Sequence, residues 1–141
     1  MRAEYKDAEA LTELVGIIWH DTPEELTEII RSYMASDDSA VFAEKANGEF
    51  IGVALCGLRR DYVEGCDTSP VGYLEGVSIR EAYRHRGIAR KLVAECEQWA
   101  REKGCTEFAS DCELTNTASL DFHLRIGFSE ENRIICFRKP L

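Results

Sequence analysis

The chain has 141 residues, 45% hydrophobic and 30% charged, which suits one globular domain over residues 1–141 with one core. No stretch has the ~18 apolar residues of a membrane-spanning helix, so no membrane partner is expected. The formal net charge of −9 argues against nonspecific nucleic-acid binding, which needs a basic face. The same charge either only aids solubility or attracts a cationic small molecule, because acidic clefts concentrate cations.

The amino-terminal residues and the cysteines bear on the compartment. Residues 1–10 (MRAEYKDAEA) contain no apolar run, so they are not expected to be a signal peptide, and a cytoplasmic location is predicted. The six cysteines include no CxxC pair and the three histidines do not cluster with them, so no metal site is predicted. Most cysteines have apolar neighbours, as in VALCGL and RIICF, and are predicted to be reduced core residues.

The first third of the chain predicts a short strand and two amphipathic helices. Residues 2–5 suit the strand, and apolar residues spaced three and four apart predict a helix over 7–18. A second helix is predicted to begin after Thr22, which forms a capping box with Glu25 and is followed by Pro23 at the first helical position.

Three strands are expected next. Residues 40–45 and 50–58 are predicted to form a hairpin, because the Asn-Gly pair at 47–48 accepts the positive φ angles of a tight turn. After a polar loop, residues 71–79 (VGYLEGVSI) are apolar on both faces apart from Glu75, which predicts a buried central strand.

The remaining elements complete an α/β pattern. A helix is predicted over 87–103, a short strand over 107–111, a helix over 117–126 and a last strand over 133–138 (RIICFR). A hairpin combined with a strand–helix–strand crossover predicts a mixed central sheet flanked by about four helices.

Residues 82–92 (AYRHRGIARKL) crowd basic side chains around one glycine at the start of a predicted helix. The first amides of a helix lack internal partners and carry partial positive charge, and Gly87 would let an anion approach them closely. Arg84, Arg86 and Arg90 add charge. The segment is neither a nucleotide P-loop nor a GxGxxG fingerprint. It is either a site for a pyrophosphate-like anion or a solvated helix start.

Residues 84–89 (RHRGIA) resemble the R/Q-x-x-G-x-G/A motif of the GNAT family of N-acetyltransferases, and residues 116–128 (NTASLDFHLRIGF) resemble its second motif. The order of predicted elements is also similar to the GNAT fold, so the resemblance covers nearly the whole chain. It implies that acetyl-CoA is the cosubstrate. The residues that it places at acetyl-CoA are Val77, Ser78, Ile79, Arg84, His85, Arg86, Gly87, Ile88, Ala89, Arg90, Asn116 and His123.

Residues 61–76 (DYVEGCDTSPVGYLEG), residues 105–116 (CTEFASDCELTN) and the Ile-Trp-x-Asp pattern at 18–21 resemble the aminoglycoside 6'-N-acetyltransferases. These enzymes acetylate the 6'-amine of antibiotics such as tobramycin and kanamycin and cause antibiotic resistance. The resemblance implies a polycationic amine as acceptor and a homodimer, to which the 133–138 strand contributes. The residues that it places at the acceptor are Trp19, Tyr62, Glu75 and Asp111.

Acetyl transfer to an alkylammonium needs a group that accepts its proton, and a second group that protonates the departing thiolate. Glu75 is the candidate base, because burial in an apolar strand raises the pKa of a carboxyl group; the alternative is a structural pair with an arginine. The resemblance implies that His123 stands where many family members carry a tyrosine that protonates the thiolate; the alternative is packing beside CoA. By the same resemblance, free amides near Val77 hold the acetyl carbonyl and Asn116 binds the pantetheine arm, a role compatible with a helix N-cap.

The acceptor residues also have structural alternatives, which are helix-face core for Trp19, a loop anchor for Tyr62 and a cap for Asp111. The chain departs from the subgroup at Leu55, where a glutamate is common, and its second helix lacks an expected histidine. An acetyltransferase for a polyamine or a protein amine, and a CoA-binding module without catalysis, are the alternative functions.

Overall fold

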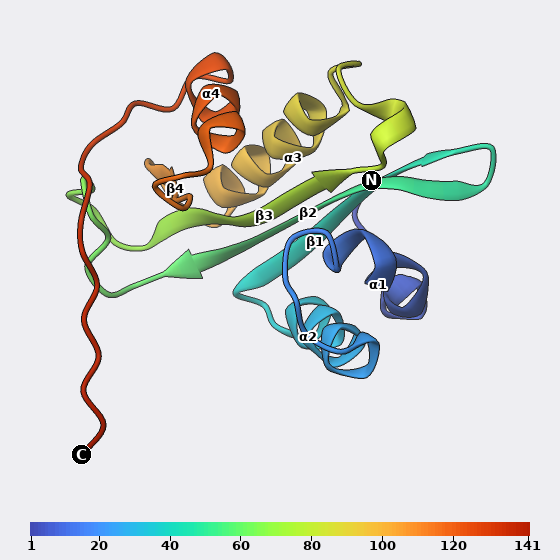
Figure 1. Cartoon of the computed structure of the whole chain (residues 1–141), viewed down its shortest axis with the longest axis horizontal. Coiled ribbons are helices and arrows are strands. Elements are labelled where there is room, and N and C mark those ends of the chain that lie inside the picture. Colours follow the sequence, from blue (N-terminus) through green and yellow to red (C-terminus); the bar gives the residue numbers. More distant parts are fainter.

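The computed structural model describes all 141 residues and shows a mixed sheet between two layers of helices (Figure 1). The strands lie in the order β1-β2-β3-β4; β1, β2 and β3 are antiparallel, and β3 and β4 are parallel. Helices α1 and α2 cover one face and α3 and α4 the other. No helix combines the length and apolar character needed to cross a membrane.

The structure contains four strands, four α-helices and two 3-10 turns. These are β1 (Ser39–Ala46), β2 (Glu49–Arg59), β3 (Val71–Ile79), β4 (Phe108–Ser110), α1 (Ala8–Val15), α2 (Pro23–Ala35), α3 (Ile88–Glu102), α4 (Thr117–Arg125), η1 (Tyr5–Asp7) and η2 (Glu81–Tyr83).

The capping box at the start of α2 is confirmed. The Glu25 amide donates to the Thr22 hydroxyl at 3.3 Å, and the Thr22 amide donates to the Glu25 carboxylate at 2.9 Å. Helix α1 ends at Val15, earlier than predicted, and the chain then crosses β3. There Ile18 lies so near Gly76 that a Cβ on Gly76 would come within 2.9 Å of it. The glycine therefore lets the α1–α2 connection lie directly on β3.

The hairpin, the central strand and the two later helices also agree with the sequence. Asn47 and Gly48 have φ angles of 52° and 82°, as a tight Asn-Gly turn requires. Strand β3 covers the predicted residues 71–79, and the helices predicted over 87–103 and 117–126 form as α3 and α4. Local patterns thus located these elements to within a residue or so of their ends.

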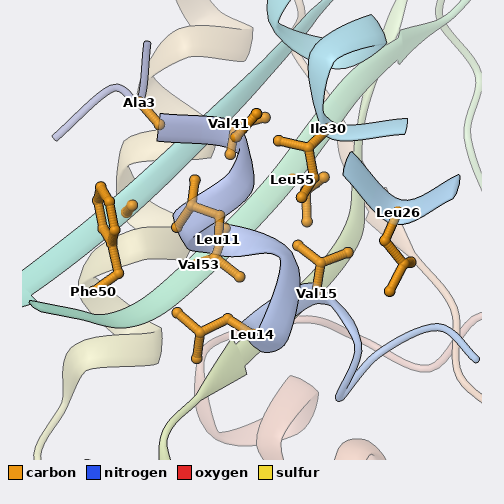
Figure 2. Packing of buried hydrophobic residues seen from close by; sticks show 12 residues of the cluster. Ala3, Leu11, Leu14, Val15, Leu26, Ile30, Val41, Phe50, Val53 and Leu55 are labelled. Carbon is orange, nitrogen blue, oxygen red and sulfur yellow. The ribbon is translucent and has the colours of Figure 1, made fainter. Parts of the chain in front are cut away.

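Strand β2 is buried on both faces because its side chains alternate between two apolar clusters. Val53 and Leu55 pack against α1 and α2, as Figure 2 shows, whereas Ala54 and Cys56 belong to the cluster under α3. Leu55 has no exposed surface. The position where a subgroup glutamate was expected is therefore part of the apolar core in this chain.

Two predicted strands are wrong. Residues 2–5 make only one bridge, between Arg2 and Phe42, before η1 begins. Residues 133–138 pair with no strand, and Figure 1 shows the chain beyond α4 running away from the sheet. Ile135 and Phe137 are 80% and 91% exposed. β-Branched and aromatic residues favour extended backbone, but a strand forms only where a neighbour offers a hydrogen-bonding ladder.

The cysteine prediction holds for half of the residues. Cys56, Cys96 and Cys105 are buried, Cys66 is half-buried, and all six are free thiols. Cys112 and Cys136 are exposed, so the prediction that RIICF contributes a core cysteine is wrong. The apolar neighbours of Cys136 belong to a segment that no other part of this chain covers.

Candidate active site

A β-bulge in the middle of β3 exposes Glu75. Across the β2–β3 ladder, Leu55 faces Gly76 and Cys56 faces Leu74, which leaves Glu75 without an opposite residue. Residues 75–77 are half-buried, whereas the strand on either side of them is buried. A bulge bends the strand and changes the direction of a side chain. Here it turns a carboxylate out of an otherwise apolar strand.

Glu75 is paired with an arginine that the sequence did not single out. The Arg59 guanidinium donates from Nε and Nη2 to Oε1 of Glu75 at 3.2 and 3.1 Å, and from Nη2 to Oε2 at 3.0 Å. Desolvation opposes the charge of Arg59, but the hydrogen bond and charge of Glu75 outweigh it and raise the pKa of the guanidinium. The Glu75 side chain is 21% exposed. Glu75 is therefore partly exposed and paired with an arginine, and is not the isolated, buried carboxylate that was expected.

Tyr73 and Asp111 extend this pair into a cluster. The guanidinium carbon of Arg59 lies 3.4 Å from the centroid of the Tyr73 ring, and the Tyr73 hydroxyl donates a hydrogen bond to the Asp111 carboxylate. Burial and this bond to Asp111 raise the pKa of Tyr73. Tyr73 precedes Glu75 by two positions on a strand, which places both on one face. We call Arg59, Tyr73, Glu75 and Asp111 the carboxylate cluster.

The aromatic residues predicted at the acceptor differ in their surroundings. Trp19 is half-buried in the α1–α2 connection, with its ring 6.3 Å from that of Tyr33. Burial and then the charge of Glu75 raise the pKa of Tyr33 to about 12. Tyr62 is 79% exposed on the loop after β2, where its hydroxyl meets Glu64 at 3.3 Å. The residue before Trp19, Ile18, lies against Gly76, so the fold brings the α1–α2 connection close to Glu75.

His123 connects α4 to the end of β4. Its Nδ1 donates to the Ser119 carbonyl oxygen at 2.6 Å, since that oxygen can only accept, and its Nε2 lies 2.8 Å from the Ser110 hydroxyl oxygen. In the neutral ring, Nε2 accepts from Ser110. In the protonated ring, Nε2 donates to Ser110, whose hydroxyl can donate to the Leu74 carbonyl oxygen at 3.2 Å. Both protonation states of His123 are therefore provided with partners.

Strands β3 and β4 separate beside this histidine. Their pairing runs from Gly72 opposite Phe108 to Leu74 opposite Ser110, and β3 then continues to Ile79 without a partner on that side. Strand β3 therefore has an unpaired edge beside Val77, where the resemblance places free amides. The Ser78 side chain is buried, with its hydroxyl donating to the Leu14 carbonyl oxygen at 2.6 Å. At this position only backbone groups remain available to a ligand.

The basic turn provides free amides at the start of α3. No protein acceptor lies within hydrogen-bonding reach of the amides of Ile88, Ala89 and Arg90. Gly87, the N-cap, has a φ of 77°, and a Cβ built on it would meet no atom within 4 Å. These donors and the open space beside them fit a pyrophosphate.

The arginines of this turn do not all converge on that point. The Arg84 side chain donates to the Ile79 carbonyl oxygen at 3.1 Å, and Arg90 donates to the Arg125 carbonyl oxygen at 2.8 Å. The Arg86 guanidinium lies over the ring of Tyr83. Arg84 and Arg90 thus hold parts of the backbone in place, and the amides supply the local anion attraction.

Asn116 caps α4, as one of its two expected roles requires. Its side-chain oxygen accepts from the Ser119 amide at 3.1 Å, while its side-chain nitrogen donates to no protein atom. This nitrogen therefore remains available as a donor for the second expected role, binding of the pantetheine arm.

Comparison with known proteins identifies the family. The model of the acetyltransferase (GNAT) family matches residues 6–128. The chain belongs to the GNAT family. A relative from Serratia marcescens, named aminoglycoside N(6')-acetyltransferase type 1, is 36% identical over 140 residues, which cover 98% of this chain and 96% of the relative. The enzyme of the same name from Salmonella typhimurium is 43% identical over 106 residues, covering 75% of this chain and 73% of the relative.

Solved GNAT structures agree over the whole chain. The apo structure of the aminoglycoside 6'-N-acetyltransferase AAC(6')-Ig from Acinetobacter haemolyticus has a TM-score of 0.95 and 30% identity, and covers 100% of this chain and 97% of that one. AAC(6')-Iy in complex with the bisubstrate analogue CoA-S-monomethyl-acetylneamine has a TM-score of 0.93 and 35% identity, with the same coverage. The predicted GNAT fold and the predicted similarity to this subgroup are both confirmed.

In this GNAT fold most predicted site residues fall into two groups. One surrounds the start of α3 and the unpaired edge of β3, and the other consists of Glu75 and Asp111 in the carboxylate cluster, with Trp19 on the neighbouring α1–α2 connection. Tyr62 lies outside both groups, exposed on the loop after β2.

Sequence reasoning missed Arg59, Tyr73 and Ser110. The two-residue spacing of Tyr73 and Glu75 could have revealed Tyr73, whereas the other two become visible only through contacts between strands.

Proposed function

We propose that this GNAT protein transfers the acetyl group of acetyl-CoA to the 6'-amine of an aminoglycoside. The observation that carries the proposal is the 36% identity to the Serratia marcescens enzyme over 98% of the chain. The geometry supports it, because free helix amides suit the anionic cosubstrate and a pair of carboxylates suits a polycationic acceptor. The chain would act as a single catalytic domain over residues 1–141.

On the cosubstrate side, acetyl-CoA when bound supplies the activated acetyl group. The free amides of Ile88, Ala89 and Arg90 would hold its pyrophosphate, with Arg86 and His85 at the rim. The unpaired edge of β3 at residues 77–79 would hold the pantetheine arm and the acetyl carbonyl, because it offers backbone donors without competing strand bonds. The free amide nitrogen of Asn116 suits the same arm.

On the acceptor side, Glu75 is the proposed base. A carboxylate attracts the substrate ammonium and can take its proton directly or through water, which leaves a neutral amine to attack. Asp111 adds negative charge through Tyr73, and Trp19 and Tyr62 offer aromatic faces for sugar rings. His123 is the proposed proton donor to the thiolate, since its ring is held at Nδ1 and has partners in both protonation states.

We also propose that the enzyme is a cytoplasmic homodimer. Its six free thiols suit a reducing compartment. The segment 133–138 carries Ile134, Ile135 and Phe137 on its surface, and covering each such side chain contributes about 1.5–3 kcal/mol. Size-exclusion chromatography with light scattering should give a dimer. Ile135→Asp with Phe137→Asp should give a monomer, whereas a native chain that is already monomeric would contradict the proposal.

The activity is tested by measuring CoA release with kanamycin, spermidine and a lysine peptide side by side. We expect turnover with kanamycin at a much higher kcat/KM than with the other two. Preference for spermidine or the peptide would indicate one of the alternative acceptors. Acetyl-CoA binding without turnover of any amine would indicate a binding module.

A further inference from the structure

The guanidinium of Arg59 contacts both the Glu75 carboxylate and the Tyr73 ring. It bonds both oxygens of Glu75 at 3.0 to 3.2 Å and stacks on the Tyr73 ring at 3.4 Å. The ring is itself bonded to Asp111. A carboxylate and an aromatic face are also the groups that bind an ammonium in water. Arg59 therefore uses the same contacts that a cationic acceptor would need.

We propose that Arg59 is an internal counter-ion that an acceptor ammonium replaces at Glu75, an inference that rests on the polycationic acceptor proposed above. Two cations beside one carboxylate repel each other, so Glu75 cannot hold the guanidinium and a substrate ammonium in the same place. While Arg59 is in position, its donors also occupy the carboxylate oxygens that would accept the proton. Displacement of Arg59 thus couples binding of the acceptor to release of the base.

The pair with Glu75 is suited to opening. Arg59 is the last residue of β2, its side chain is 43% exposed, and its guanidinium has no hydrogen-bonding partner besides Glu75. Arg80, by contrast, is held by the Phe50 carbonyl oxygen as well as by the Glu13 carboxylate. Partly exposed ion pairs contribute little to stability, so a ligand with several positive charges can compete with this one.

Two variants of Arg59 and one control variant test whether the charge of Arg59 competes with the acceptor. Arg59→Gln removes the internal cation, and the KM for kanamycin should fall about threefold to fivefold while kcat changes by less than about twofold. Arg59→Lys keeps a cation, so its KM should stay near that of the native enzyme. Arg60→Gln removes the same charge from the next residue, which pairs with Asp38 instead, and should leave both constants unchanged.

A rise in KM, or a fall in kcat at constant KM, for Arg59→Gln would show that Arg59 holds Glu75 in position and would overturn the proposal. Acetyl-CoA affinity and the thermal midpoint of each variant check that the fold is intact. If kanamycin is not an acceptor, neither the native enzyme nor any variant turns it over, and that outcome contradicts the proposed function alone. Calorimetric titration with spermidine then decides on Arg59: tighter binding to Arg59→Gln supports the counter-ion, and equal or weaker binding overturns it.

Discussion

The two halves of the candidate site are built in different ways. At the start of α3, three consecutive amides and the backbone of Gly87 form an anion site. The carboxylate cluster instead combines side chains from the ends of β2 and β4 and the bulge of β3. A backbone site of this kind is contiguous in the chain and recognisable as a motif. A side-chain site assembled from three strands has no continuous motif.

The difference also decides what a substitution can remove. A side chain that carries the chemistry can be deleted by one change, whereas a backbone N–H donor survives every change of side chain except a change to proline. We therefore expect the largest losses at the side chains of the acceptor half. Losses at the anion site should appear only where a substitution alters the path of the backbone.

The largest effect is expected for Glu75→Gln. It keeps the shape of the side chain but removes the base, so kcat should fall about 100-fold or more while acetyl-CoA affinity stays unchanged. Steady-state kinetics with kanamycin and calorimetry with acetyl-CoA measure the two quantities. Glu49→Gln, an exposed carboxylate at the hairpin end of β2, is the matched control. A loss of kcat below about threefold would exclude Glu75 as the base.

His123→Asn should have an intermediate effect. Asparagine keeps a polar group beside Ser110 but cannot supply a proton, so kcat should fall about tenfold to 100-fold. Because a proton donor acts on the departing thiolate, the acceptor KM should change little. Single-turnover rates with acetyl-CoA and kanamycin measure the step. An unchanged rate would indicate that the ring only packs against Phe122 and Phe128.

The smallest effect is expected for the backbone of the anion site. Gly87 and Gly104 both have positive φ, 77° and 88°, and both have open space around a built Cβ. Gly87→Ala and Gly104→Ala should therefore each lose about 1 kcal/mol of stability. Only Gly87→Ala should also weaken acetyl-CoA binding, by about tenfold, because the free amides that follow residue 87 would turn away from the ligand. Equal acetyl-CoA affinities in the two variants would show that Gly87 does not shape the anion site.

Much of the fold was accessible from local signals. The capping box at Thr22, the Asn-Gly turn at 47–48 and the apolar strand 71–79 each act over a few neighbouring residues, and each formed as predicted. The motif around Gly87 is local in the same sense. Such signals come from backbone preferences and hydrogen bonds within one turn, which do not depend on the rest of the chain.

The surroundings of Glu75 were not accessible in this way. The sequence shows a carboxylate in an apolar strand, which suggests burial, but the ladder between β2 and β3 shifts there and turns the side chain toward Arg59. The register of two strands depends on packing over their whole length. For the same reason the link between Ser110 and His123 could not be read from either residue.

Segment 133–138 shows that a local sequence preference alone does not determine whether a strand forms. Its consecutive apolar residues, which include β-branched and aromatic side chains, establish a preference for extended backbone, and the residues of β3 establish the same preference. β3 lies between two strands that supply hydrogen bonds and is covered by helices on both faces, whereas 133–138 meets no such neighbour within this chain. Local sequence patterns thus specified the helices and the turn of this protein, and its acetyl-CoA motif was recognisable through its resemblance to the GNAT family. The strand partners, the bulge at Glu75 and its pairing with Arg59 depended on contacts between residues distant in sequence, which form only when the chain has packed.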